Sequence, residues 1–150
     1  MKTIARTSVH TIGWREFVHL PELGIGPVMA KIDTGARTAA LHAENISCYD
    51  RDNMQRVRFD AFVDDRNNAI ASCDLPLHGI KRVKNTGGKV EVRYVIETPI
   101  AVGEHVFTAL ISLTGRADMG VSMLIGRVTI GGRFLVHPAR GFLLSKRPGP

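Results

Sequence analysis

One short segment of the chain holds a carboxylate that could carry hydrolytic chemistry. Residues 33–36 read Asp-Thr-Gly-Ala, and they follow a mostly apolar run, residues 28–32, that predicts a β-strand ending at Asp33. Hydrolysis of a peptide bond by an activated water needs a general base and a general acid, and two carboxylates can supply both. Gly35 would let the backbone turn tightly beside the carboxylate. The simpler alternative is that the carboxylate caps an exposed turn.

The acid–base chemistry needs a pair of carboxylates, whereas the 150 residues contain one Asp-Thr-Gly segment. Two carboxylates held close together cannot both ionise, so they share a proton and titrate as a unit. Such a pair therefore requires a symmetric homodimer, with Asp33 contributed by each subunit at the two-fold axis. The predicted catalytic residues are Asp33, Thr34 and Gly35.

A second segment, residues 123–127, reads Met-Leu-Ile-Gly-Arg. We predict that Ile125, Gly126 and Arg127 have structural roles next to the catalytic segment. The guanidinium of Arg127 is expected to brace the catalytic loop through a structural salt bridge rather than to contact substrate.

The elements that must position these segments are strands, because apolar residues recur with period two far more often than with period 3.6. The 15 glycines and seven prolines imply many turns. The sequence therefore predicts a mostly β protein, a small closed or partly closed barrel in a single domain over residues 1–150, with a frayed tail at 145–150. One or two short helices are expected, at 38–44 and 127–130.

A hairpin with a glycine-containing turn is predicted over residues 81–89, and it concentrates basic side chains. It is the candidate flap over the cleft. The predicted substrate-binding residues are Ala36 and Arg37, directly after the catalytic segment, and Arg82, Lys84 and Arg93, in or beside the hairpin. The alternative for the basic side chains is a solvated face without a ligand.

The composition narrows the choice of partners. A formal net charge of +6 favours an acidic partner, and an aromatic content of only 6% disfavours nucleic acid, which needs stacking side chains. No apolar stretch approaches the roughly 20 residues of a membrane span. Cys48 and Cys73 are expected to be reduced thiols in a cytoplasmic protein. The histidines lack metal-ligand spacing and no phosphate-binding loop is present, so neither a metal nor another cofactor is expected.

The two segments together resemble the hallmarks of a known family. Residues 30–36 resemble the active-site loop of retropepsin-like aspartic proteases, and residues 123–127 resemble their second hallmark, which leads into a short helix. With residues 20–24, 40–43 and 93–96, the pattern is similar to one bacterial branch. This branch contains the RimB-like proteins, which are associated with the RimK-type glutamate ligase and are also named ATP-dependent zinc proteases.

The resemblance implies a retropepsin-like closed barrel and a symmetric dimer in which Asp33 is the catalytic carboxylate. It implies that Thr34 braces the two loops across the dimer axis and that Gly35 helps to bind the water or the substrate backbone. It also implies a protein substrate with an acidic or poly-glutamate tail added by the ligase. Viral members carry an acidic residue where this chain has Arg37, and the counterpart of Arg127 pairs with that carboxylate. The resemblance therefore implies a different partner for Arg127 in this chain, for which Asp118 is the candidate. A cation at Arg37 suits an acidic substrate side chain.

Three functions remain open from the sequence. The favoured prediction is a homodimeric aspartic endopeptidase that acts on acidic tails. One alternative is a non-catalytic module that binds acidic tails in the same cleft. The other is a zinc-dependent peptidase, as the name of the branch suggests.

Overall fold

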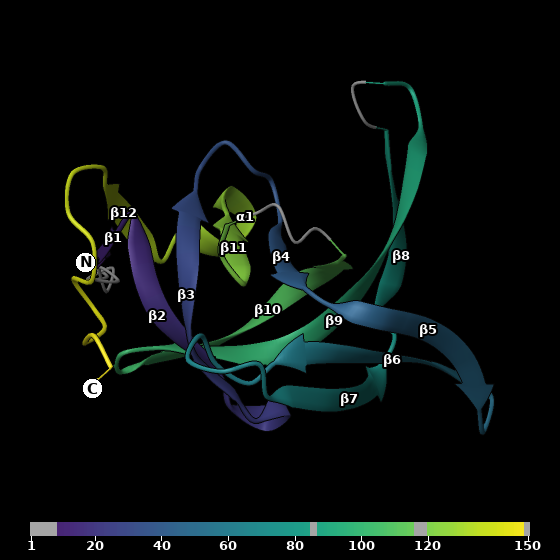
Figure 1. Ribbon diagram of the computed structural model, residues 1–150. Helices are drawn as coiled ribbons and strands as arrows, with labels where there is room; N and C mark the ends of the chain where they lie inside the picture. The colour runs from purple at the N-terminus through teal and green to yellow at the C-terminus, as the bar shows by residue number, and fades with distance from the viewer. Residues whose placement is uncertain (1–8, 85–86, 116–119, 149–150) are drawn as a thin grey trace, which may run out of the picture.

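Six strands form a closed barrel at the centre of the molecule (Figure 1). The computed structural model describes residues 9–84, 87–115 and 120–148. Neighbouring strands of the barrel follow the order β10-β4-β11-β3-β2-β9, and pairing of β9 with β10 closes the ring. These strands are β2 Arg15–Leu20, β3 Ile25–Asp33, β4 Ala39–His42, β9 Val90–Val102, β10 His105–Thr114 and β11 Met123–Gly126.

The barrel is filled by side chains from alternate positions of its strands, because successive side chains of a strand point to opposite faces. In β2, Glu16, Val18 and Leu20 are buried and the residues between them are more exposed. The period-two pattern of the sequence therefore reports the inward face of the barrel. The largest fully buried side chains of the barrel strands include Leu20, Ile25, Leu41, Ile96, Ile100, Ile111, Leu113, Met123 and Ile125.

Smaller elements extend the barrel. Strand β8 lengthens the sheet next to β9, strands β5, β6 and β7 form a separate antiparallel sheet, and β1 pairs in parallel with β12. Their bounds are β1 His10–Gly13, β5 Glu44–Arg51, β6 Met54–Phe62, β7 Ile70–Pro76, β8 Gly79–Lys84 and β12 Phe134–His137. The helical elements of the described residues are a 3-10 turn, Pro21–Leu23, and the one-turn helix α1, Arg127–Ile130.

The predicted fold class is confirmed: a closed, mostly β barrel with very little helix. The short helix at 127–130 is confirmed as α1. The helix expected at 38–44 is wrong, because Ala39–His42 is strand β4. All four residues of β4 are buried between β10 and β11, and a fully buried strand has no alternation that would distinguish it from a short helix.

A buried carboxylate ties the C-terminal segment to the barrel. The side chain of Glu16 on β2 is 0% exposed and accepts hydrogen bonds from the backbone N–H of Gly13 at 2.7 Å and of Leu143 at 2.9 Å. It also accepts bonds from the N–H of Leu144 at 3.2 Å and from the N–H and Oγ of Ser145 at 3.0 and 2.6 Å. Ser145, the first residue of the predicted frayed tail, is thus anchored. Fraying beyond it stays a prediction.

Candidate active site

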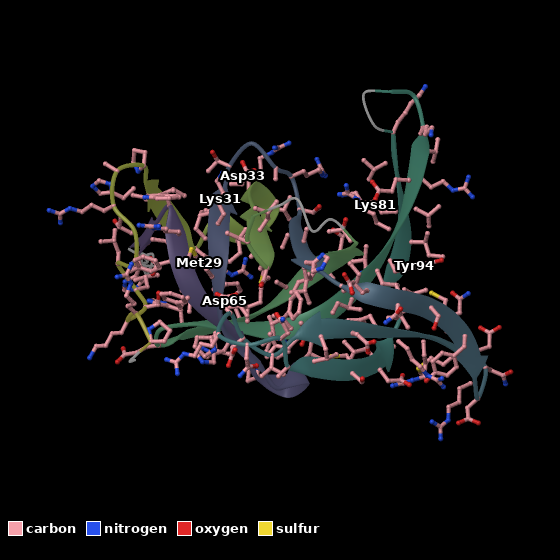
Figure 2. All side chains as sticks on the ribbon, viewed as in Figure 1. Met29, Lys31, Asp33, Asp65, Lys81 and Tyr94 are labelled. Carbon is pink, nitrogen blue, oxygen red and sulfur yellow. The ribbon has the colours of Figure 1, made fainter. Side chains whose placement is uncertain are left out.

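Asp33 lies at the end of β3, where β11 runs parallel beside it and Gly126 is its partner in the strand register (Figure 2). The chain turns directly after Asp33: the N–H of Gly35 donates to Oδ1 of Asp33 at 2.9 Å, and the N–H of Ala36 donates to the Asp33 carbonyl at 3.2 Å. Among the described residues, Oδ2 of Asp33 accepts no hydrogen bond. One oxygen of the carboxylate is therefore oriented by the loop, and the other is left for water or substrate.

The first residues of α1 hold this loop in place through hydrogen bonds. The N–H groups of Arg127 and Val128 donate to the carbonyls of Ala36 and Arg37 at 2.9 and 3.0 Å. The guanidinium of Arg127 donates to the carbonyl of Gly35 at 3.2 Å. Within the described part of the chain Arg127 forms no ion pair, and Asp118, its predicted partner, lies outside the described residues. Arg127 thus braces the loop through a backbone carbonyl.

Gly126 brings β11 into contact with the chain that follows the loop. An added Cβ would lie 2.6 Å from the carbonyl oxygen of Thr38 and 2.7 Å from its carbonyl carbon and nitrogen. All three are backbone atoms, so they cannot rotate away as the end of a flexible side chain would. The predicted structural role of Gly126 therefore has a steric cause. Ile125, its buried neighbour, packs in the core.

Replacing Gly126 by alanine should separate β11 from the loop and lower the free energy of unfolding by about 1–3 kcal/mol, the usual cost of overpacking. Urea denaturation measures this loss. Gly79→Ala is the matched control, because a Cβ at Gly79 meets no atom within 4 Å, and it should change stability by less than about 1 kcal/mol. Equal stability of the two variants would show that the close approach at Gly126 does not constrain the loop.

A cavity of about 400 Å³ lies between this loop and the hairpin of β8 and β9. The hairpin rises at the end of the barrel where the loop after β3 lies (Figure 1). Lys81 of β8 spans the gap, since its Nζ lies 3.5 Å from Oγ1 of Thr38. The cavity is lined by Arg37, Thr38, His78, Gly79, Ile80, Lys81, Val95, Leu110, Ser112 and Val128.

The predicted substrate-binding residues are not all brought together. Arg37 lines the cavity, and Ala36 lies in the loop beside it. Arg82 and Lys84 are exposed on β8 and do not line it. Arg93 faces Lys81 across the hairpin and is paired with Glu91 at 3.3 Å. Strands β8 and β9 pair in antiparallel orientation, as the hairpin predicted over 81–89 requires, and residues 85–86 of its turn lie outside the described residues.

The sequence did not single out Lys81 and His78 as site residues. Alternation along β8 separates Lys81 from Arg82 and Lys84, because successive side chains of a strand point to opposite faces. That signal was present in the sequence, but it cannot say which face of the hairpin looks toward the loop.

The described residues do not provide a zinc site. No group of three or more His, Cys, Asp or Glu side chains among them could hold a metal ion. Cys48 and Cys73 form no disulfide, and burial raises the pKa of both thiols, which disfavours the thiolate that a metal would bind. His42 is buried and lies 3.5 Å from Glu44 without a third ligand.

The similarity to a known family extends over the barrel strands, the loop after β3 and α1. The family model described as retropepsin-like aspartic endopeptidase RimB matches residues 11–147. The chain belongs to the RimB-like family. This confirms the family that the two hallmark segments predicted.

The relatives of this RimB-like chain are longer proteins, and the similarity covers only part of each of them. It is 33% identical over 137 residues to a probable alpha-L-glutamate ligase of Shewanella halifaxensis, covering 91% of this chain and 30% of that protein. It is 35% identical over 131 residues to a protein of the same name from Desulfotalea psychrophila, covering 85% of this chain and 28% of that protein. The chain thus spans less than a third of these relatives.

A solved structure shows the same fold. A protein of unknown function from Legionella pneumophila, Lpg0085, superposes with a TM-score of 0.75 at 28% sequence identity. The alignment covers 91% of this chain and 99% of that one. The arrangement of the RimB-like barrel is therefore shared over nearly the full length of both chains.

Proposed function

We propose that this protein is an aspartic endopeptidase that works as a symmetric homodimer and cleaves acidic or poly-glutamate tails of proteins. The observation that carries the proposal is the position of Asp33. Its carboxylate lies at the end of β3 in a loop held by Gly126 and α1, with one oxygen oriented by Gly35. Membership in the RimB-like family supports the same chemistry.

In the proposed reaction, Asp33 and Asp33 of the partner subunit share one proton. The ionised carboxylate takes a proton from a water molecule, and the water oxygen adds to the carbonyl carbon of the peptide bond. The protonated carboxylate gives its proton to the carbonyl oxygen. When the tetrahedral intermediate collapses, the C–N bond breaks and the leaving nitrogen takes up the proton of the protonated carboxylate. One hydroxyl of the intermediate gives its proton to the other carboxylate as the new C=O bond forms, so the pair again holds one proton.

Charge and the nature of the relatives support an acidic substrate. The chain carries a net charge of +6, and Arg37 lines the cavity beside the catalytic loop. The relatives that contain a similar region are named probable alpha-L-glutamate ligases. A peptidase related to part of a glutamate ligase would find its substrate in the glutamate chains that such a ligase makes.

The experiment that tests this function uses a peptide ending in a run of glutamates, incubated with the protein and analysed by mass spectrometry. Shortened products are expected, and they should form equally in the presence of a metal chelator. A peptide that binds but yields no product would support a non-catalytic binding module instead. Loss of cleavage with chelator would support a zinc-dependent peptidase.

The proposed mechanism predicts a dimer under the conditions of the assay, because one chain supplies one Asp-Thr-Gly loop. Thr34, which is exposed at the tip of this loop, would brace the two loops across the axis. Sedimentation velocity at assay concentrations should give the mass of two chains, and activity per chain should fall on dilution. A monomer with full activity would contradict the shared pair of carboxylates.

No helix among the described residues is long and apolar enough to cross a membrane. The cytoplasmic location stays a prediction.

A further inference from the structure

We propose that the cavity between the catalytic loop and the β8–β9 hairpin is a specificity pocket for a glutamate side chain, and that Lys81 is the residue that recognises its carboxylate. This inference rests on the proposed function, since it assigns a substrate side chain to a cavity lined by Arg37 and Thr38, which follow the loop of Asp33. It differs from the sequence-based prediction, which placed the basic contacts of the hairpin at Arg82, Lys84 and Arg93.

The charges of the cavity are the first argument. Of the described residues that line it, Arg37 and Lys81 are cationic and none is acidic. Neither cation forms an ion pair within the described part of the chain. By contrast, Arg56 is paired with Asp74 at 2.8 Å, and Arg93 is paired with Glu91 at 3.3 Å. The cavity thus keeps two uncompensated positive charges, and an anionic group is what they can bind favourably.

The position of Lys81 is the second argument. Its backbone is held in the ladder of β8 opposite Arg93, and its ammonium group reaches Oγ1 of Thr38 at 3.5 Å. Thr38 follows the catalytic loop and its backbone lies close to Gly126, so Lys81 contacts the segment that β11 holds next to the loop. An ammonium group has three N–H donors, so a single bond to Thr38 leaves two for a substrate carboxylate.

The apolar wall is the third argument, because it distinguishes glutamate from a smaller anion. Ile80 is 54% exposed, Leu110 43% and Val128 57%, and all three line the same cavity, although large apolar side chains are usually buried. A glutamate side chain presents two methylene groups to such a wall and a carboxylate beyond them. Aspartate has only one methylene group, so it would reach the cations with less apolar contact.

Two peptides that differ only by glutamate or glutamine at the tail positions test this assignment. Wild-type protein should prefer the glutamate peptide. Lys81→Met keeps the length of the side chain and removes its charge. It should lower kcat/KM for the glutamate peptide roughly 10- to 100-fold, as expected for a lost charge-assisted hydrogen bond, and leave the glutamine peptide unchanged.

Lys146→Met is the matched control, because it removes one positive charge from the C-terminal segment, on the other side of the barrel from the hairpin (Figure 1). It should change kcat/KM for both peptides by less than about threefold. Equal losses on both peptides with Lys81→Met, or an unchanged preference for glutamate, would overturn the assignment.

Peptide binding to Asp33→Asn protein, measured by calorimetry, separates this inference from the proposed function. Weaker binding of the glutamate peptide when Lys81→Met is added would support the pocket even if the wild-type protein cleaved nothing, in which case only the endopeptidase proposal would fail. Cleavage without any effect of Lys81→Met on binding or on kcat/KM would leave the endopeptidase in place and overturn the pocket.

Discussion

Replacing Asp33 by asparagine is expected to lower kcat for cleavage of a glutamate-tailed peptide by roughly a thousandfold or more. In the homodimer this substitution removes both carboxylates, and with them the general base and the general acid, each of which contributes on the order of 10²- to 10⁴-fold. The fold should persist, because the amide oxygen of asparagine can still accept the hydrogen bond that the N–H of Gly35 donates at 2.9 Å. Steady-state kinetics with product detection by mass spectrometry measures the effect.

Asp52→Asn is the matched control for this substitution. Asp52 is exposed in the turn between β5 and β6 with a φ of 52°, a conformation that asparagine also tolerates. Its kinetics and its circular dichroism spectrum should equal those of the wild-type protein. Retention of cleavage by a folded Asp33→Asn variant would exclude the aspartic mechanism.

Replacing Glu16 by alanine is expected to lower the free energy of unfolding by about 3–5 kcal/mol, because it leaves buried N–H groups without their acceptor. The carboxylate is fully buried and accepts bonds from Gly13, Leu143, Leu144 and Ser145. Hydrogen bonds to a charged group contribute more than neutral ones, and a single carboxylate here serves several donors. Urea denaturation measures the loss.

The matched control for Glu16 is Glu104→Ala, an exposed glutamate between β9 and β10. It should change the free energy of unfolding by less than about 0.5 kcal/mol. Limited proteolysis gives a second reading, because the segment after Phe142 should be cleaved much faster in Glu16→Ala than in the control. Similar stability and similar proteolysis of the two variants would show that Glu16 does not anchor the C-terminal segment.

The sequence could predict the family and the class of the fold. Asp33 is recognisable because an apolar strand leads into it and a glycine follows it, and both signals are local. Val57, Phe59 and Ala61 of β6 show the period-two pattern on which the fold class was predicted, since these side chains point to one face and are all buried. Local patterns of this kind can be recognised in the sequence without knowing which segments lie next to them in the fold.

Features that depend on contacts between distant segments could not be predicted. Residues 38–44 were expected to form a helix, because a strand buried on both faces loses its alternation, and only the neighbouring strands β10 and β11 explain why β4 is extended. Glu16 gave no signal either, since its partners lie up to 129 residues away. The same holds for the contact of Lys81 with Thr38, across 43 residues.

The sequence by itself therefore determined the Asp-Thr-Gly segment, the glycine and arginine that contact its loop, and a basic protein built mostly of strands. Only the tertiary structure decided that Arg127 holds the loop through the carbonyl of Gly35, and that Lys81 and Arg37 share one cavity. The physical reason is that the identity and spacing of residues follow from the chain alone. Which face of a hairpin meets which loop depends instead on the closure of the barrel, and a period-two pattern is the same for either face.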